Sequence, residues 1–358
     1  MEFIPNPSRP DRVTPSAPSF PLPADIPYPL DDATPVLALL GRCPAAQETP
    51  LVDLSDLAAE CGIATLWAKD ERTRMGLGSF KALGAAYVIA HAAAEANPDD
   101  PLGALKGRTF VTASAGNHGL SVAAGAAIFG ARAVIYLSDT VPDSFAQRLT
   151  AKGAEVVRAG RTYEASMDAA AQTAEAEGWT LLSDSSWEGY TEIPQRLMQG
   201  YLALMAEVAE QVTEPPTHVF VQAGVGGLAA AVAVYVRARW GDAPYVVVVE
   251  PDAAPCIAQS LANGAFTPVR GPVSDMGRLD CKEASMIALR GLARDADAVV
   301  TLSDPEVNGV LKRLADLGVA TTASGGASLA AVMLSRTHRD ALGLDPTSRV
   351  LTFVTEAP

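Results

Sequence analysis

Lys81 stands among small and apolar residues in the stretch GSFKALGAAY, which runs from Gly78 to Tyr87. Burying an ammonium group is costly, and desolvation lowers the pKa of a lysine because it penalises the charged form. An uncharged amine is a base and a nucleophile, so this position predicts covalent chemistry with a carbonyl compound. The alternative interpretation is a surface lysine at a helix start, with its stem lying along apolar neighbours.

A glycine-rich loop follows a predicted strand in VFVQAGVGGLAAAVAVYV. Gly224, Gly226 and Ala229 satisfy the pattern G-x-G-x-x-A, and Glu250 ends the next predicted strand, which together resemble a dinucleotide fingerprint. Such a loop at a helix N-terminus binds any phosphate, because its unpaired amides and the helix dipole attract the anion. A dinucleotide, another phosphorylated cofactor and a purely structural turn are all consistent with the loop.

Lys81 distinguishes between these alternatives. A hydride-transfer enzyme does not need a lysine at an apolar helix start, whereas pyridoxal phosphate needs a phosphate site and an amine that loses its proton near neutral pH. The lysine and the loop together favour pyridoxal phosphate. A nicotinamide-dependent oxidoreductase, based on Gly224, Gly226, Ala229 and Glu250, is the remote alternative.

Short β-branched runs alternate with alanine-rich helical stretches along most of the chain, which predicts parallel sheets covered by helices on both faces. Because so many strands would strain a single open sheet, we expect two doubly wound α/β lobes. The predicted helices cover residues 118–129, 163–177, 193–212 and 305–317. The predicted strands cover residues 65–70, 109–113, 133–138, 155–160, 180–184, 217–224, 245–250, 298–303 and 350–355.

Composition limits the class of protein. The 358 residues are 49% hydrophobic and 19% charged, which is typical of a globular protein with substantial cores. A formal net charge of −14 argues against a nucleic-acid partner, since phosphate backbones need a positive field. No stretch is apolar for the length of a membrane span and the first residues show no signal-peptide pattern, so we expect no membrane partner and a cytoplasmic location.

Cysteine and proline usage adds two expectations. The four cysteines have no CxxC spacing and the four histidines form no ligand-spaced pairs, so we expect reduced, mostly buried thiols and no metal site. Residues 1–36 are crowded with proline, which disfavours helix. This segment is predicted to be an irregular arm that wraps a lobe or a partner subunit.

Four motifs occur in the order in which they appear in the fold-type II pyridoxal-phosphate enzymes, the group of threonine and serine dehydratases. They are GSFKALGA, TASAGNHGLSVA, QAGVGGLAAA and VEPD, and the resemblance runs from about Pro35 to the last residue. Within the group, LLSDSSWEGYTEIPQRLMQGYLALMAEVAEQ and VVVEPDAAPCIAQSLANG are most similar to the diaminopropionate ammonia-lyases. Ordinary threonine dehydratases lack the block from Trp187 to Tyr190, although core packing is the alternative interpretation of that aromatic pair.

The resemblance implies the fold of the tryptophan synthase β chain, with the cofactor in a cleft between two α/β lobes. The large cofactor-binding domain would comprise residues 37–81 and 185–358, and the arm residues 1–36. Residues 82–184 would form a small mobile domain that closes over an amino-acid substrate. A homodimer is implied by the resemblance alone.

The family pattern also implies cofactor contacts. Lys81 would join the cofactor aldehyde, Phe80 would pack beside the ring and Asn117 would hydrogen-bond the 3-hydroxyl group. Thr355 falls where the family places a hydroxyl group against the pyridine nitrogen, which weakens the electron sink and favours elimination over transamination. The phosphate would be held by Gly224, Val225, Gly226, Gly227 and Leu228.

The same pattern implies the route of the reaction. After an amino acid displaces Lys81 from the cofactor, the freed amine would take the α-proton as a general base. Asp184 stands at a family carboxylate implicated in proton handling for an ammonia leaving group, and its alternative interpretation is a helix N-cap. The aminoacrylate would hydrolyse to a 2-oxo acid and ammonia. The substrate carboxylate is expected at the helix start formed by Ser114, Ala115, Gly116 and His118.

Departures from the family bear on the substrate. Ala115 stands where bacterial diaminopropionate lyases carry an aspartate thought to deprotonate the D-enantiomer, so we expect a preference for L-isomers. Ser324 replaces a frequent glutamate, and Lys282 and Ala284 replace the usual glycine and proline. The predicted function is therefore β-elimination from a β-substituted L-amino acid of the diaminopropionate type. A serine, threonine or 3-arylserine dehydratase is the alternative, and a catalytically silent binding protein is left open.

Overall fold

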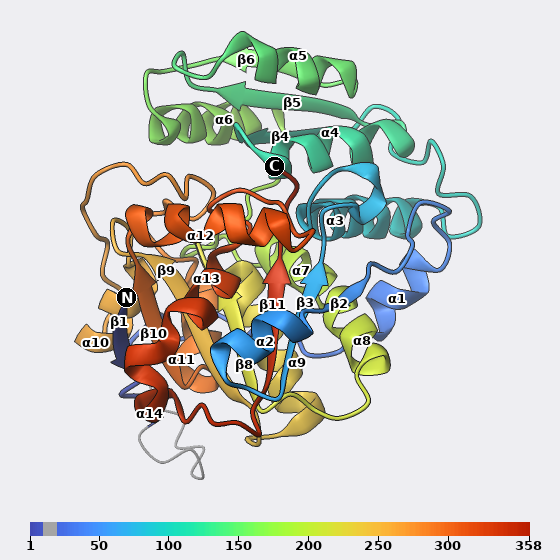
Figure 1. Ribbon diagram of the computed structural model, residues 1–358. Helices are drawn as coiled ribbons and strands as arrows, with labels where there is room; N and C mark the ends of the chain where they lie inside the picture. The colour runs from blue at the N-terminus through green and yellow to red at the C-terminus, as the bar shows by residue number, and fades with distance from the viewer. Residues whose placement is uncertain (10–19) are drawn as a thin grey trace.

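The computed structural model describes residues 1–9 and 20–358, so part of the predicted arm lies outside the described residues. Its strands form two separate sheets of seven and four strands, which lie one above the other in Figure 1. This arrangement confirms the prediction of two α/β lobes. No helix in the described part of the chain is long and apolar enough to cross a bilayer.

The large sheet has the strand order β1-β10-β9-β8-β11-β3-β2. Its central strands run parallel, whereas β1 pairs antiparallel with β10 and β2 pairs antiparallel with β3. The strand bounds are Glu2–Pro5 (β1), Leu51–Asp53 (β2), Thr65–Asp70 (β3), His218–Gln222 (β8), Tyr245–Pro251 (β9), Ala298–Leu302 (β10) and Arg349–Val354 (β11).

The small sheet has the order β6-β5-β4-β7, and all its strands run parallel. Every predicted strand of both sheets is present, with ends shifted by a few residues. The bounds in the small sheet are Thr109–Ala113 (β4), Arg132–Leu137 (β5), Glu155–Arg158 (β6) and Thr180–Leu181 (β7).

Helices cover both faces of each sheet. In the first half of the chain they are Thr34–Leu40 (α1), Ser55–Cys61 (α2), Lys81–Ala96 (α3), Asn117–Ile128 (α4), Asp143–Ala151 (α5) and Tyr163–Glu177 (α6), with a 3-10 turn at Arg74–Gly76 (η1). In the second half they are Glu192–Gly200 (α7), Leu202–Gln211 (α8), Gly227–Trp240 (α9), Cys256–Asn263 (α10), Met286–Asp295 (α11), Asp304–Asp316 (α12), Ala327–Leu334 (α13) and Arg339–Leu342 (α14), with a 3-10 turn at Ser335–His338 (η2).

The buried strand β9 shows how the large lobe is packed. Val246 and Val248 lie in one core cluster with residues of α9 and α11, and Val247 and Val249 lie in another with residues of α2, α12 and α13. Successive side chains of a strand point to opposite faces, so a continuous apolar run fits a parallel sheet that is covered on both sides. The valine run therefore specifies a strand in the middle of three layers.

Two predictions about the elements are wrong. The helix predicted over 193–212 is divided into α7 and α8 at Tyr201, because Gly200 fits against α3, where a Cβ would lie 2.7 Å from Leu83 O. The arm predicted as irregular contains β1 and the start of α1. β1 ends in Pro5, and proline is tolerated there because an edge strand does not need every N–H.

The two lobes meet where the site is built. α3 packs against α4 of the small lobe and α7 of the large lobe. The carboxyl end of β11 points toward the small sheet, and the C-terminus lies at the boundary between the two sheets (Figure 1). The start of α3, the start of α4 and the residues after β11 are thereby brought to one place.

Candidate active site

Lys81 is the first residue of α3, and its Nζ donates a hydrogen bond to Asp184 Oδ2 over 2.6 Å. The two side chains are 23% and 20% exposed, so they meet in a partly open position. Asp184 follows β7 and is not a helix N-cap, because the next helix begins only at Glu192. An amine and a carboxylate thus face each other across the boundary between the lobes.

This ion pair changes the charge expected for a free Lys81 amine. Burial lowers the pKa of Lys81, but the charge and hydrogen bond of the Asp184 carboxylate, together with Tyr201 and Cys281, raise the pKa above its usual value. Burial likewise raises the pKa of Asp184, but the Lys81 ammonium, together with His118 and a backbone hydrogen bond, leaves that pKa well below its usual range. The prediction that burial makes Lys81 neutral is therefore wrong for the free amine, because it left out the facing carboxylate.

Two aromatic rings flank the amine. Phe80 and Tyr201 meet edge to face with ring centroids 4.9 Å apart, and Lys81 Nζ lies 5.3 and 5.9 Å from the two centroids. Tyr201 is buried and its hydroxyl has no hydrogen-bond partner in the described residues. Burial raises the pKa of Tyr201 to about 12, although the Lys81 ammonium opposes this. Tyr201 was not predicted as a site residue. The signal for it is Gly84, where a Cβ would lie 2.7 Å from the Tyr201 ring.

Tyr190 holds the segment that carries Asp184. Its hydroxyl donates to Leu181 O over 2.7 Å and accepts from Ser183 N over 3.0 Å. Its ring stacks on Trp187 with centroids 4.4 Å apart. Trp187 is 37% exposed, so the aromatic pair is not core packing. Its role is to fix the chain before Asp184.

The predicted substrate segment forms the start of α4. Ser114 Oγ accepts hydrogen bonds from Gly116 N and Gly119 N over 3.2 and 3.1 Å, so its own hydrogen stays available to another acceptor. His118 Nε2 lies 2.8 Å from Leu182 O. Because a carbonyl group only accepts, Nε2 carries the hydrogen and the buried Nδ1 is an acceptor without a partner in the described chain. Burial lowers the pKa of His118, which keeps the ring neutral.

Glu356, which was not among the predicted site residues, links α4 to the end of β11. Its Oε2 accepts a hydrogen bond from Asn117 Nδ2, and its Oε1 accepts one from Thr322 Oγ1. Arg278 Nε lies 3.8 Å from the same Oε2. The carboxylate is buried and orients groups from three separate segments. Its position beside Thr355 is the one signal of Glu356 in the sequence.

Thr355 lies directly after β11 and is buried. Its Oγ1 accepts a hydrogen bond from Gln222 Nε2 over 3.2 Å, and its carbonyl group accepts one from Phe80 N over 3.1 Å. The second contact ties Thr355 to the residue before Lys81. Ala115, at the start of α4, is half-buried and offers no acidic group.

The glycine loop occupies the start of α9. Gly226 has φ +95°, and a Cβ there would lie 3.0 Å from Ile257 Cδ1. A Cβ at Gly224 would lie 2.9 Å from Cys281 Sγ. The N-cap residue makes no side-chain hydrogen bond, so the first amides of α9 can face an anion. The loop is completed by Val225, Gly227 and Leu228.

Glu250, the acidic residue of the dinucleotide fingerprint, is fully buried. Its two carboxylate oxygens accept from Ile257 N over 2.9 Å and Ala258 N over 2.8 Å, at the start of α10. Burial raises the pKa of Glu250 to about 7. The oxidoreductase interpretation thereby loses its ribose-binding residue.

The residues that differ from the family pattern lie on or contact one loop, between α10 and α11. Lys282 Nζ is held by Asp280 and by two backbone carbonyl groups, and Ala284 is buried. Ser324 Oγ accepts from Arg278 N over 3.0 Å. Cys281 on this loop is unpaired and half-buried. The substitutions therefore set the position of the loop that carries Arg278.

The arrangement fits a pyridoxal phosphate group. It offers an amine for an aldehyde, an uncapped helix start for a phosphate, and glycines whose replacement would fill the loop. The Tyr201 hydroxyl and His118 Nδ1 are buried polar atoms that lack a protein partner among the described residues. Buried polar groups are normally hydrogen-bonded, so these two atoms indicate a bound polar group.

The comparison with protein families agrees with this fit. The family described as "Pyridoxal-phosphate dependent enzyme" matches residues 43–356. The chain therefore belongs to this family of fold-type II lyases, and its cofactor is pyridoxal phosphate. Diaminopropionate ammonia-lyase of Salmonella typhimurium is 35% identical over 274 residues, which are 71% of this chain and 68% of that protein. A probable D-serine dehydratase of Burkholderia thailandensis is 31% identical over 189 residues, covering 51% of this chain and 41% of that protein.

Solved structures resemble the whole chain. Diaminopropionate ammonia-lyase of Escherichia coli, crystallised with an aminoacrylate-PLP azomethine reaction intermediate, superposes with a TM-score of 0.86 and 28% identity. The superposition covers 99% of this chain and 93% of that one. Maize serine racemase, with a TM-score of 0.77 and 23% identity, shares the fold over 91% of this chain and 93% of its own.

Proposed function

We propose that the enzyme eliminates the β-substituent of β-substituted L-amino acids to give an aminoacrylate, which water hydrolyses to a 2-oxo acid and ammonia, with L-2,3-diaminopropionate as the leading substrate. The 2.6 Å contact between Lys81 and Asp184 carries this proposal, because it places a base and an acid at one point. The relatives named diaminopropionate ammonia-lyase support the choice of substrate.

Pyridoxal phosphate, when bound, stabilises negative charge at the α-carbon of an attached amino acid. In the proposed reaction the Lys81 amine takes the proton from the α-carbon. The electron pair of that C–H bond forms the Cα=Cβ double bond as the bond from Cβ to nitrogen breaks. Lys81 and Asp184 can exchange a proton over their contact, so together they supply the proton with which the β-amino group leaves as ammonia.

The other predicted residues receive roles that their free donors and acceptors support. Asn117 has a second N–H for the cofactor 3-hydroxyl group, since Glu356 accepts only one. The Thr355 hydroxyl is proposed to face the ring nitrogen, and the loop of residues 224–228 the phosphate. The Ser114 hydroxyl and the start of α4 are proposed to hold the substrate carboxylate.

A β-hydroxy amino acid dehydratase is the second candidate. A hydroxide leaving group also needs a proton, which Lys81 and Asp184 can supply together over the same contact. The similarity to a probable D-serine dehydratase supports this alternative. Ala115 has no side-chain group that could take the α-proton of a D-isomer from the face opposite Lys81, so both candidate enzymes are expected to prefer L-isomers.

The test is a panel of L- and D-isomers of diaminopropionate, serine, threonine and 3-arylserines, assayed with the holoenzyme for 2-oxo acid and ammonia. We expect the highest kcat/KM for L-diaminopropionate and values lower by at least about a hundredfold for D-isomers. The variant Lys81→Ala should release nothing, and borohydride should not fix the cofactor on it.

Two other results would change the assignment. A higher kcat/KM for a hydroxy amino acid would favour the dehydratase. No release from any panel member would contradict both candidates and favour a binding protein.

We also propose that residues 82–184 move as a small domain over residues 37–81 and 185–358, and that the protein forms a cytoplasmic homodimer. The arm and α1 expose Tyr28, Leu30 and Leu37, which supports a partner surface there. Light scattering should give twice the mass of the chain, and the mass of a single chain would contradict the dimer.

A further inference from the structure

Arg278 lies on the loop between α10 and α11, and its side chain packs against the start of α4. A Cβ at Gly116 would lie 3.5 Å from Arg278 Nε and 3.6 Å from its Cζ. The same Nε lies 3.8 Å from Glu356 Oε2, the oxygen that accepts a hydrogen bond from Asn117. The guanidinium group therefore lies over the residues proposed to hold the substrate carboxylate.

The charge of Arg278 is available to a ligand. The side chain is 50% exposed, and the contact with Glu356 is longer than a hydrogen bond. In the described part of the chain the guanidinium group donates no hydrogen bond, although it has five N–H donors in a fork that matches a carboxylate. Glu356 is buried and bound to Asn117 and Thr322, so it orients the arginine without occupying its donors.

The backbone of Arg278 is fixed in place. Its N–H donates to Ser324 Oγ over 3.0 Å, and its carbonyl oxygen lies 3.0 Å from the position of a Cβ on Gly224. The loop that bears the arginine is thus packed against the proposed phosphate loop. A side chain that starts from a fixed backbone can hold a ligand in one orientation.

We propose that Arg278 binds the α-carboxylate of the amino-acid substrate. Its guanidinium group makes an ionic, forked contact with the carboxylate, in addition to the contacts from the neutral donors at the start of α4. This assignment rests on the proposed function of the cleft and deepens it: the substrate must be an amino acid with a free carboxylate, and amides or esters of the same amino acids are poor ligands.

The test compares L-alanine with L-alaninamide, which differ in the carboxylate and have no β-substituent to lose. Their Kd values are measured on the holoenzyme by calorimetry. The wild type should bind L-alanine at least about tenfold more tightly. Arg278→Gln should weaken L-alanine binding by about ten- to a hundredfold and leave L-alaninamide unchanged, since a hydrogen bond to a charged group is lost.

Two variants serve as controls. Arg278→Lys keeps the charge without the fork and should retain an intermediate preference for L-alanine. Arg270→Gln removes an exposed arginine from the same loop and should change neither Kd. Circular dichroism and the cofactor absorbance of each variant should match the wild type. If Arg278→Gln misfolds, the Kd values of Arg278→Lys for the two ligands are compared with those of the wild type instead.

Three outcomes would overturn the inference. In the first, the wild type binds L-alanine and L-alaninamide with equal affinity, or binds neither measurably. In the second, Arg278→Gln loses affinity for both ligands to the same extent. In the third, the Kd for L-alanine is unchanged in Arg278→Gln. Because L-alanine cannot undergo β-elimination, the comparison does not depend on turnover. A protein that binds L-alanine through Arg278 but releases no 2-oxo acid would lose the proposed function and keep this inference.

Discussion

At the residue scale, the contact between Lys81 and Asp184 controls when the amine can react. A lysine attacks an aldehyde only after it loses its proton. The Asp184 carboxylate raises the pKa of the free Lys81 amine in spite of burial. Cofactor uptake is therefore expected to become faster as the pH rises.

The variant Asp184→Asn tests this control. Removing the carboxylate lowers the pKa of Lys81, so the pH at which uptake reaches half its maximal rate should move to lower values. Uptake is followed by absorbance after apoenzyme is mixed with pyridoxal phosphate at several pH values. Turnover of the loaded variant should fall by about a hundredfold, because the proton partner is gone. Asp316→Asn, on the surface of α12, is the matched control, and a profile that does not move in Asp184→Asn would contradict the argument.

Some site residues could be predicted from the sequence and others could not. Lys81, Asn117 and the glycine loop stand in ordered motifs, and the fold brings them to one boundary. Tyr201 and Glu356 act through contacts with segments far away in the chain, which no local pattern records. The charge of Lys81 was misjudged for the same reason, since Asp184 is 103 residues away.

At the scale of elements, the long buried strands were the easiest to predict, because parallel strands covered on both faces appear as unbroken β-branched runs. The short edge strands β1 and β2 have no such run. The break between α7 and α8 also has no local signal, because Tyr201 and Gly200 pack on α3. Element boundaries that are set by tertiary contacts therefore cannot be predicted from local sequence patterns.

Substitutions at two helix glycines test this packing, because they are expected to change the free energy of unfolding in opposite directions. Gly84→Ala in α3 places a Cβ 2.7 Å from the Tyr201 ring and should destabilise the protein by about 1–3 kcal/mol through overpacking. Gly309→Ala in α12 meets no atom within 4 Å and should stabilise it by about 1 kcal/mol through helix propensity. Denaturant unfolding measures both changes, and equal effects of the two variants would contradict the packing argument.

The buried cap of α10 predicts a pH dependence of stability. The pKa of Glu250 is raised from 4.5 to about 7 in the folded protein. A raised carboxyl pKa stabilises the folded state below pH 4.5, and this contribution is lost as the pH rises to about 7, by about 3 kcal/mol in total.

Glu250→Gln cannot titrate, so its free energy of unfolding, measured relative to that of the wild type, should increase by about 2.5 kcal/mol between pH 5 and pH 8. Unfolding in urea at the two pH values measures this shift. A constant difference between the two proteins would show that Glu250 does not titrate in this range.

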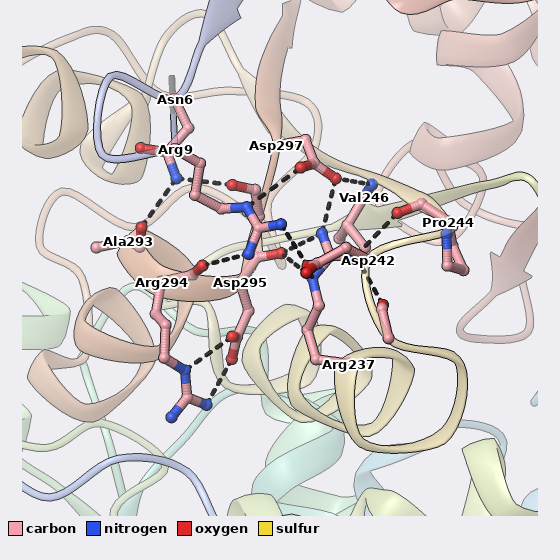
Figure 2. Close-up of polar contacts among 12 residues, drawn as sticks. Asn6, Arg9, Arg237, Asp242, Pro244, Val246, Ala293, Arg294, Asp295 and Asp297 are labelled. Atoms are coloured by element: carbon pink, nitrogen blue, oxygen red, sulfur yellow. Dashed lines mark hydrogen bonds and ion pairs between the residues drawn. The ribbon is translucent and has the colours of Figure 1, made fainter. Parts of the chain in front are cut away.

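At the scale of the whole molecule, the first residues are tied to the large lobe by a buried network (Figure 2). Asn6 Nδ2 donates to three carbonyl groups at the end of α11. Arg9 and Arg237 both donate to Asp297, which also accepts from Val246 N. The network therefore joins the start of the chain to α9, α11 and β9.

Asp297→Ala should reduce the free energy of unfolding by about 3 kcal/mol, because two nearly buried guanidinium groups lose a counter-charge. Asp316→Ala removes a carboxylate from an exposed pair with Lys312 and should cost less than about 0.5 kcal/mol. Thermal and urea unfolding of both variants measure the contrast. Similar losses would mean that the network is no stronger than a surface ion pair.

β1 also has a consequence for solubility. It pairs with β10 and ends the large sheet on that side with four residues, the last of them a proline. An uncovered strand offers a row of free amides and carbonyl groups to any passing chain. A protein that begins at residue 10 would present the run AVVTL of β10 in this way. We expect such a shortened chain to polymerise through its sheets, which turbidity and a cross-β diffraction pattern would reveal.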